Sequence, residues 1–413
     1  MLKSNLLNNL QTRGFIHDCT DLVALDDLLK RSKVTCYIGY DATASSLHVG
    51  HLMNIMMLRW FQKDGHRVIT LLGGGTTKIG DPSFRKTERP IINDEAINTN
   101  LVALKSIFSK YIQFSSDFPG ALMLNNDEWL GKLNYLEFLR DIGKHFSINR
   151  MLSFDSVKSR LKKNDSLSFL EFNYMILQGY DFYKLNNDHE CILQMGGSDQ
   201  WGNIVNGIEL TRRMNGNKIF GLTSPLLTNS AGQKMGKSFN GAIWLNEDSL
   251  SPYEFWQFWR NCEDDDIEKY LLLFTEFSTE RIKELTARKG HHLNEAKITL
   301  ANEVTKLCHG KIKAADAFET SKAVFDENTS SSNLPIVEID KKNCSENISI
   351  IQLLTMSGVV RSGKEARRLI IDQAVKLEGR LISDVSHKYE TTSFANPQKL
   401  SIGKKKHVNV VII

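Results

Sequence analysis

The stretch Tyr37-Ile-Gly-Tyr-Asp-Ala-Thr-Ala-Ser-Ser-Leu-His-Val-Gly-His51 marks a change from a strand to a helix. The run Val34–Tyr40 is rich in β-branched and aromatic residues, while apolar residues at helical spacing begin near Val49. In parallel α/β sheets, ligands bind beyond the carboxyl ends of the strands. The stretch therefore predicts an α/β fold with a ligand site at this turn.

The same alternation of strands and helices continues to about Leu226. Strands separated by helices of this length form βαβ units with a mostly parallel sheet. We therefore predict a Rossmann-like domain of the α/β class. The other predicted strands are Val68–Leu72, Ala121–Leu124 and Cys191–Met195, and the predicted helices are Val49–Lys63, Asp94–Ser109, Trp129–Ile142, Leu167–Gln178 and Gln200–Met214.

Two further modules are predicted in the second half of the chain. Residues 250–325 have helical periodicity and no strand pattern, and a polar, Ser-rich linker begins at Asp326. After it, short helices are predicted over Ile348–Leu354 and Gly363–Ile371, followed by hairpin-like alternation around Glu378-Gly379. An all-α module and a small α+β module therefore follow the α/β domain.

Composition and charge narrow the class of protein. The 413-residue chain is 41% hydrophobic and 24% charged, which is typical of a globular protein with several domains. It has no apolar run long enough to span a membrane, and its six cysteines show no paired spacing. We therefore expect a cytoplasmic protein with reduced thiols and no membrane partner.

The net charge of +4 is unevenly distributed, since residues 349–413 carry eleven Lys or Arg against five Asp or Glu. A compact basic module indicates a phosphate-rich partner. A solubilising tail is the alternative that charge alone leaves open.

Two basic-polar motifs could bind one polyanion. The first, His48-Val-Gly-His51, opens a predicted helix whose N-terminus adds partial positive charge. The second, Lys234-Met-Gly-Lys-Ser238, follows a run of small residues in which the chain can move. Two imidazoles and two ammonium groups match the triphosphate of ATP when a carboxylate attacks its α-phosphorus and charge spreads over the phosphate oxygens. Each motif alone also fits ordinary side chains, but their order and local context favour ATP.

A second group of polar residues indicates a pocket for the molecule that carries this carboxylate. Tyr174, Gln178 and Asp181 recur at positions i, i+4 and i+7, so they share one face of the helix predicted to begin near Leu167. These side chains need hydrogen-bond partners, which makes them unusual as a core stripe. Tyr37, at the end of the first strand, could face the same pocket. The polar outer face of an ordinary amphipathic helix is the alternative.

Further polar residues follow predicted strands. Asp81 lies in Ile79-Gly-Asp-Pro82, while Asp199 and Gln200 follow the strand predicted to begin at Cys191. One crevice at the carboxyl edge of the sheet can collect them together with His48. The run Gly73-Gly74-Gly75 lacks dinucleotide-binding spacing and predicts a tight turn beside the ligand.

Together these motifs resemble the bacterial-type tyrosyl-tRNA synthetases, a family of class I aminoacyl-tRNA synthetases. The resemblance covers nearly the whole chain. The two ATP motifs alone would indicate only class I, whereas the helix with Tyr174, Gln178 and Asp181, together with Tyr37, resembles the tyrosine pocket. The other matching segments are Gly80-Asp-Pro82, Asn173-Tyr-Met-Ile-Leu-Gln178, Tyr180-Asp-Phe182 and Gly196-Gly-Ser-Asp-Gln-Trp-Gly-Asn203.

The resemblance implies activation of L-tyrosine with ATP and its transfer to tRNA(Tyr). Tyr37 and Asp181 would hydrogen-bond the phenol hydroxyl, because phenylalanine would leave this buried pair unpaired. The α-ammonium group would contact Asp81, Tyr174 and Gln178, with Gln200 near the carboxylate. The residues implied for ATP are Gly39, Asp41, Thr43, His48, Gly50, His51, Asp199, Lys234, Lys237 and Ser238, of which Thr43, His48, His51, Lys234 and Lys237 would be catalytic at the phosphates.

Mg²⁺ is expected with ATP, without a metal site held by the protein. The resemblance also implies a homodimer paired through the segment near Asp127–Leu161, with each tRNA bridging both subunits. In the C-terminal module, which resembles a small RNA-binding fold, Lys364, Arg367 and Arg368 could meet tRNA phosphates. The resemblance implies four regions. A catalytic domain covers 1–228, and residues 229–325 contain the loop of the second ATP motif, which is of the KMSKS type, with a helical anticodon-binding domain. A linker covers 326–348 and an RNA-binding domain covers 349–413.

The sequence departs from the family pattern at three places. Ala42 stands where proline is common, so the turn before Thr43 is expected to be less rigid. Ile38 stands where several members have cysteine, which removes one polar contact to the ribose. Met235-Gly236 is a mixed version of the loop. None of the three removes a charge that the chemistry needs.

Three other functions would use part of this pattern. A tryptophanyl enzyme shares the chemistry, but an indole has less use for the Tyr37 and Asp181 pair. A non-catalytic RNA-binding relative would be expected to lose ATP-contacting histidines or lysines, and all four are present. A small nucleotidyltransferase would not need residues 250–413.

Overall fold

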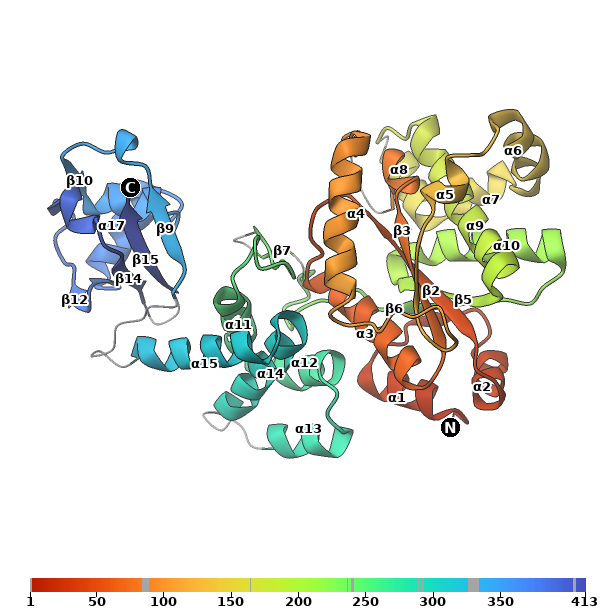
Figure 1. Cartoon of the computed structure of the whole chain (residues 1–413), viewed down its shortest axis with the longest axis horizontal. Coiled ribbons are helices and arrows are strands. Elements are labelled where there is room, and N and C mark those ends of the chain that lie inside the picture. Colours follow the sequence, from red (N-terminus) through yellow and green to blue (C-terminus); the bar gives the residue numbers. More distant parts are fainter. Residues whose placement is uncertain are drawn as a thin grey trace. The chain divides into compact units, whose positions relative to one another are not determined.

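The computed structural model divides the chain into two compact units, Met1–Ser249 with Glu263–Lys289, and Leu250–Cys262 with Gly290–Ile413 (Figure 1). Within the described parts of the chain, no helix is both long enough and apolar enough to cross a membrane. The residues that the structure describes are 2–83, 89–163, 165–235, 237–238, 241–287, 290, 293–325, 334–403 and 406–413.

A six-stranded sheet in the order β1-β6-β5-β2-β3-β4 forms the centre of the first unit. All neighbouring pairs are parallel except β1 with β6. The carboxyl ends of the parallel strands therefore meet at one edge, as predicted for a ligand site. The strands are β1 (Asp18–Cys19), β2 (Thr35–Asp41), β3 (Arg67–Gly73), β4 (Leu122–Asn125), β5 (Cys191–Gly197) and β6 (Phe220–Ser224).

Helices cover both faces of this sheet. On one face the ring of Tyr37 packs against Phe182, with ring centroids 5.3 Å apart. On the other face Tyr40 packs against Phe108 at 4.7 Å. Because successive side chains of a strand point to opposite faces, β2 contributes to both layers. The predicted α/β class with a parallel sheet is confirmed.

The helices of the first unit include the long α9, which packs beside α10 (Figure 1). The predicted bounds of α3 are the observed ones. The observed α9 ends at His189, which is eleven residues beyond the predicted end at Gln178. The helices are α1 (Asn5–Arg13), α2 (Leu22–Arg31), α3 (Val49–Lys63), α4 (Asp94–Phe108), α5 (Asp127–Leu130), α6 (Tyr135–Asp141), α7 (Ile148–Ser153), α8 (Asp155–Lys162), α9 (Phe169–His189), α10 (Trp201–Asn215), α12 (Ile267–Phe274) and α13 (Thr279–Thr286), with 3₁₀ turns η1 (Thr76–Lys78), η2 (Gly143–His145), η3 (Ser198–Gln200) and η4 (Asp264–Asp266).

One predicted helix is wrong as a single element. The segment 129–142 is divided between α5 and α6, because the chain leaves the first helix at Gly131. Asn134 then starts the second, where its side chain accepts hydrogen bonds from Leu136 N and Glu137 N. An N-capping asparagine favours a helix start over a helix interior. The strand β6 was also not predicted, since its five residues contain Gly221 and give little pattern.

The second unit begins with three packed helices, α11 (Pro252–Arg260), α14 (Leu293–His309) and α15 (Lys311–Phe325). Trp256 and Trp259 of α11 are almost fully buried. No strand occurs among the described residues from 250 to 325, as the sequence predicts.

The C-terminal part of this unit is a small α+β fold. It has α16 (Ile350–Met356), α17 (Gly363–Ile371) and a five-stranded sheet in the order β12-β11-β14-β15-β9. The predicted hairpin is confirmed, and Glu378 and Gly379 both have positive φ at its turn. The strands are β9 (Ile336–Ile339), β10 (Asn347–Ser349), β11 (Val375–Leu377), β12 (Arg380–Leu381), β13 (Lys388–Glu390), β14 (Gln398–Ile402) and β15 (Lys406–Ile412), and β9, which lies within the range predicted as linker, pairs with β15.

Candidate active site

The two histidines of the first motif sit at the N-terminus of α3. His48 is the N-cap residue, and its Nδ1 accepts a hydrogen bond from Gly50 N at 3.1 Å. The Nδ1 of His51 accepts from His48 N at 3.2 Å, and the ring centroids are 4.0 Å apart. With Nδ1 as acceptor, Nε2 carries the proton of each neutral ring. Burial and the neighbouring His48 lower the pKa of His51 to about 3, so His51 is a neutral hydrogen-bond donor.

The segment after the second motif pairs with the segment that leads into α3. Val49 N donates to Ile243 O at 2.9 Å, and Leu245 N donates to Leu47 O at 2.8 Å. The two motifs, far apart in sequence, are therefore joined by backbone hydrogen bonds.

Lys234 lies near both the histidines and the β5 edge. Its positive charge contributes to the lowered pKa of His51 and acts against the burial that raises the pKa of Asp199. A Cβ atom on Gly50 would lie 3.3 Å from the Met235 carbonyl oxygen, so the loop backbone approaches this glycine closely.

The rest of the second motif is described only in part. Lys237 and Ser238 form β7 (Lys237–Ser238), which pairs with β8 (Gly241–Ala242). Their side chains, and Gly236, lie outside the described residues. The contacts predicted for Lys237 and Ser238 with ATP therefore stay predictions.

A buried carboxylate forms the centre of the predicted hydroxyl-reading group. Asp181 Oδ1 accepts from Trp129 Nε1 at 2.7 Å, and Oδ2 accepts from Asn126 Nδ2 at 2.9 Å. Burial raises the pKa of Asp181 to about 7. Tyr37 is 1% exposed and its Oη has no hydrogen-bond partner among the described residues. Burial, together with the charge of Asp181, raises the pKa of Tyr37 well above its ordinary value, so the phenol stays protonated.

A second carboxylate is linked to the first through shared donors. Tyr174 Oη donates to Asp41 Oδ2 at 3.0 Å, and Thr76 Oγ1 donates to Asp41 Oδ1 at 2.8 Å. Asn126 Nδ2 also donates to Thr76 Oγ1 at 3.0 Å, so one amide connects both carboxylates. Burial and the charge of Asp81 raise the pKa of Asp41 to about 6. Asp41, predicted from resemblance as an ATP contact, thus lies beside the residues predicted for the amino acid.

The remaining predicted residues meet at the carboxyl ends of β3 and β5. Gln200 Nε2 donates to Asp81 Oδ2 at 2.9 Å. Asn203 Nδ2 donates to Gln178 Oε1 at 2.9 Å and to Gln200 Oε1 at 3.2 Å. Asp199 shares the turn with Gln200, so polar groups from the segments that follow β3 and β5, and from α9 and α10, converge here.

Three residues in this network were not identified from the sequence. Asn126 and Trp129 hold Asp181, and Thr76 holds Asp41. Asn126 follows β4 directly, and a polar residue after a strand was the signal that could have found it. Trp129 resembled the apolar face of a helix, so its indole N–H gave no signal.

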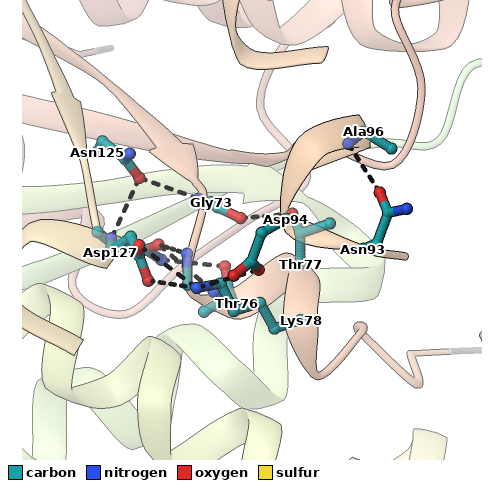
Figure 2. Close-up of polar contacts among 12 residues, drawn as sticks. Gly73, Thr76, Thr77, Lys78, Asn93, Asp94, Ala96, Asn125 and Asp127 are labelled. Atoms are coloured by element: carbon teal, nitrogen blue, oxygen red, sulfur yellow. Dashed lines mark hydrogen bonds and ion pairs between the residues drawn. The ribbon is translucent and has the colours of Figure 1, made fainter. Parts of the chain in front are cut away.

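The turn over Gly73–Gly75 is held by side chains from the end of β4 (Figure 2). Asn125 Oδ1 accepts from Gly74 N at 3.1 Å, and Asn126 Oδ1 accepts from Gly75 N at 2.8 Å. A Cβ atom on Gly74 would clash with Asn125 Oδ1, so a larger residue does not fit while this hydrogen bond is kept. The predicted tight turn is confirmed, and it sets η1 and therefore Thr76.

An exposed ion-pair group supports this turn on its outer side. Lys78 Nζ lies 3.3 Å from Asp127 Oδ1 and 3.4 Å from Asp94 Oδ1 (Figure 2). The side chain of Asp94 is 75% exposed, so these pairs contribute little to stability.

The departure at Ala42 has a structural explanation. Ala42 N donates to Thr77 Oγ1 at 2.7 Å, and the same hydroxyl donates to Gly73 O. Proline would remove this N–H and place its ring against the hydroxyl. The bridge through Thr77 joins the ends of β2 and β3, so the turn before Thr43 is fixed by a hydrogen bond instead of a proline ring. The expectation of a less rigid turn stays a prediction.

The remaining residues of the β2 end differ in exposure. Gly39 is exposed, with no atom within 4 Å of a Cβ position, so a ligand can approach its backbone. Ile38 is 3% exposed and faces the core. Thr43 is half-buried.

The basic residues of α17 form one exposed face. Lys364, Arg367 and Arg368 are exposed, while Ala366 and Ile370 of the same helix are fully buried. An amphipathic helix of this kind directs its positive charge to solvent, where it can meet a polyanion.

Comparison with known proteins defines the class. The model of the family described as "tRNA synthetases class I (W and Y)" matches residues 4–326. The chain belongs to this family. A C-terminally truncated mitochondrial tyrosyl-tRNA synthetase from Aspergillus nidulans has a similar structure, with TM-score 0.71 and 31% identity over 78% of this chain and 95% of that chain.

Full-length relatives are more similar. The tyrosine--tRNA ligase of Dinoroseobacter shibae is 56% identical over 98% of this chain and 97% of its own length. The tyrosine--tRNA ligase of Mesorhizobium japonicum is 51% identical over 99% of this chain and 98% of its own length.

Proposed function

We propose that the chain is a tyrosine--tRNA ligase that couples L-tyrosine to tRNA(Tyr) in two steps. First, a carboxylate oxygen of tyrosine attacks the α-phosphorus of ATP; a P–O bond forms, and the bond to the bridging oxygen breaks to release pyrophosphate. Second, a terminal ribose hydroxyl of the tRNA attacks the tyrosyl carbonyl carbon, and AMP leaves. The observation that carries the proposal is the buried pair Tyr37 and Asp181, linked through Asn126 to the second carboxylate.

Recognition of the phenol hydroxyl uses this pair. Tyr37 Oη donates to the substrate oxygen, and the substrate hydroxyl donates to Asp181, whose other hydrogen bonds fix the carboxylate in place. Phenylalanine would leave the buried Tyr37 Oη without a partner and would remove the donor that the substrate hydroxyl offers to Asp181, which costs more than one lost hydrogen bond. This favours tyrosine over phenylalanine and over the indole of tryptophan.

The α-ammonium group binds among Asp41, Asp81, Tyr174 and Gln178. The substrate's positive charge stabilises the ionised form of Asp41, whose pKa is raised in the free protein. Gln200, which donates to Asp81, lies where it orients the neighbouring substrate carboxylate toward ATP.

The phosphates bind at the start of α3. His48 and His51 donate from Nε2, and Lys234 and Lys237 neutralise charge on the leaving pyrophosphate. Thr43 contacts the same phosphates, while Gly39, Gly50, Asp199 and Ser238 contact other parts of the nucleotide. Mg²⁺ enters with ATP and is held mainly by phosphate oxygens and water, as it commonly is when it accompanies a nucleotide.

Three other functions are disfavoured. A tryptophan enzyme has less use for the Tyr37 and Asp181 pair, because an indole N–H can donate to Asp181 but offers no oxygen that accepts from Tyr37. A non-catalytic RNA-binding protein has no need for the converging histidines, Lys234 and buried carboxylates. A small nucleotidyltransferase would not need the second unit.

We also propose that the enzyme is a homodimer paired through the segment 127–161 and the adjoining start of α9. Large apolar side chains are exposed there in a group that a monomer would leave in water. Pairing two copies through this segment would bury them and allow each tRNA to bridge both subunits. The exposed side chains are Tyr135, Leu136, Leu139, Ile148, Leu152, Leu161, Phe169 and Leu170.

In this proposal residues 1–228 are catalytic, residues 229–325 contain the loop and the helices that read the anticodon region, and residues 349–413 are the RNA-binding module. The structure groups α12 and α13 with the first unit and pairs β9 with the sheet of the RNA-binding module. A cytoplasmic location, where tRNA charging takes place, fits this activity. Deleting residues 349–413 should spare tyrosine-dependent pyrophosphate exchange and impair tRNA charging, because Lys364, Arg367 and Arg368 contribute affinity through phosphates. Unchanged charging would contradict the RNA-binding role.

The central test is amino-acid-dependent exchange of labelled pyrophosphate into ATP, with tyrosine, tryptophan and phenylalanine supplied separately. Exchange with tyrosine alone supports the reaction and the hydroxyl-reading pair. Exchange with tryptophan would keep the reaction and overturn the substrate. No exchange from folded protein would favour the RNA-binding alternative.

A further inference from the structure

Lys234 is carried by a compact hairpin with its own internal hydrogen bonds. Asn229 N donates to Gln233 O at 2.9 Å, and Gly232 N donates to Asn229 O at 2.9 Å. Gln233 N donates to Asn229 Oδ1 at 2.8 Å, and Thr228 pairs with Lys234 across the hairpin. A displacement of the turn would therefore move Lys234 with it.

The turn of this hairpin is bound by the segment that starts α12. Asp266 is 3% exposed, and its Oδ2 accepts from Ser230 N at 3.0 Å and from Ser230 Oγ at 3.2 Å. Lys269 Nζ donates to Thr228 O at 2.6 Å. Hydrogen bonds to a buried carboxylate are among the stronger ones in proteins. The hairpin is thus held at its tip and at its stem.

Asp266 does not make the capping hydrogen bond that its place before α12 would predict. It occupies the N-cap position, where aspartate usually accepts from the backbone of the first helical turn. Here its side chain makes no capping hydrogen bond and contacts Ser230 instead. Stabilisation of its own helix therefore does not account for this buried aspartate.

The helix α12 is in turn fixed to the parts of the unit that carry the histidine motif. The guanidinium of Arg13 donates to Leu272 O at 2.8 Å and to Thr275 O at 3.0 Å. Just after α12, Glu276 Oε1 forms an ion pair with Arg59 Nε of α3 at 2.6 Å. Since α3 begins with His48 and His51, the helix α12 connects both ATP motifs.

We propose that Asp266 is a positioning residue for catalysis, which acts through Ser230 to set the place of Lys234 relative to His51. The inference rests on the proposed reaction, because it assumes that Lys234 contacts the phosphates. It adds that the hairpin before the loop is a fixed support. The segment after the loop is fixed as well, by its pairing with residues 47–49.

The test compares Asp266→Asn and Ser230→Ala with Asp265→Asn, which makes the same charge change at an exposed residue of the adjoining η4. Adenylate formation is followed by stopped-flow fluorescence in the full-length enzyme, and tyrosine affinity by equilibrium dialysis without ATP. Misplacing a catalytic group by about 1 Å can cost about 100-fold, so we expect about tenfold slower adenylate formation in Asp266→Asn and about threefold in Ser230→Ala. Tyrosine Kd should change less than about twofold, because the tyrosine residues are not touched.

The outcomes separate this inference from the proposed function. Wild-type exchange with tyrosine establishes the reaction before any variant is measured. Because Ser230 is exposed, its alanine variant should fold even if Asp266→Asn does not. The inference is overturned if Ser230→Ala matches Asp265→Asn in rate, or if tyrosine affinity falls in proportion to the rate. Ser230→Thr, which keeps the hydroxyl, should recover most of the rate.

Discussion

The tyrosine end and the ATP end of the site are built differently. At the tyrosine end, Tyr37 and Asp181 are 1% and 2% exposed, and Asp181 is held by two donors from the β4–α5 segment. At the ATP end, Lys234 is exposed on a hairpin that is fixed through its turn and stem. One end is buried and hydrogen-bonded within the sheet, and the other reaches the site from a separate part of the chain.

This difference indicates that the two ends of the site have different roles. Buried polar groups discriminate strongly, because a wrong substrate leaves them unpaired. Exposed lysines discriminate little, but they can stabilise charge that appears only as pyrophosphate leaves. We therefore expect changes at the tyrosine end to alter substrate choice and affinity, and changes at the ATP end to alter the rate.

The largest effect is expected for Lys234→Ala. Removing one group that stabilises transition-state charge commonly costs about 100- to 1000-fold in rate. Adenylate formation measured by stopped-flow fluorescence should slow by this amount, while tyrosine Kd from equilibrium dialysis stays within about twofold.

Lys110→Ala, an exposed lysine on the turn after α4, provides the matched control and should be neutral. If Lys234→Ala weakened tyrosine binding as much as it slowed the rate, the two ends would not be separate. The assignment of different roles to the tyrosine end and the ATP end would then be wrong.

The next largest effect is expected for Asp181→Asn, at the tyrosine end of the site. The variant keeps the volume but loses the charged acceptor for the phenol hydroxyl, so the preference for tyrosine over phenylalanine should fall about 100-fold. The measurement is kcat/KM for pyrophosphate exchange with each amino acid.

Asp188→Asn, about two helix turns beyond Asp181 on α9 and paired with Lys184, is the control. It should leave the preference unchanged. A preference for tyrosine that survives Asp181→Asn would place the hydroxyl contact elsewhere.

Lys234 and Asp181 also show what the sequence could predict. Lys234 was found because its short motif follows a fixed spacing, and Asp181 because it repeats at helical intervals with Tyr174. The bounds of α3 were predicted correctly, since a polar N-cap and apolar spacing are both local signals.

The supports of both residues were missed for one physical reason. Asn126 contacts Asp181 from 55 positions away, and Asp266 contacts Ser230 from 36 positions away. Such contacts depend on how strands and helices are brought together, which no local pattern contains. The turn at Gly131 and Asn134 was local, but it was interpreted as part of a continuous apolar helix face.

A smaller effect is expected when pH is varied. Burial raises the pKa of Asp181 to about 7, so below that pH the free protein holds a neutral acid that accepts the substrate hydroxyl poorly. From pH 6 to pH 8, kcat/KM for tyrosine should rise about tenfold, following ionisation of one group. In Asp181→Asn the remaining dependence should move toward the pKa of about 6 of Asp41.

The same pKa shift has a consequence for stability with a definite sign. A raised carboxyl pKa contributes to the unfolding free energy fully below the unfolded value and loses that contribution as pH rises through about 7. The free enzyme should therefore lose stability between pH 5 and pH 8, and Asp181→Asn should lose less. Denaturant unfolding at both values measures this, and equal losses in the two proteins would contradict the shifted pKa.

The smallest effect is expected at Thr77, which lies between the two ends. Thr77→Val keeps the shape but leaves the buried N–H of Ala42 without an acceptor, at a cost of about 1–3 kcal/mol in the unfolding free energy. Thr77→Ser keeps the hydroxyl and should recover most of this stability. Because the turn supports both Asp41 and Thr43, the KM values for tyrosine and for ATP should rise together, each by about twofold to fourfold. A rise confined to one substrate would mean that the two ends are separated even at the strand that joins them.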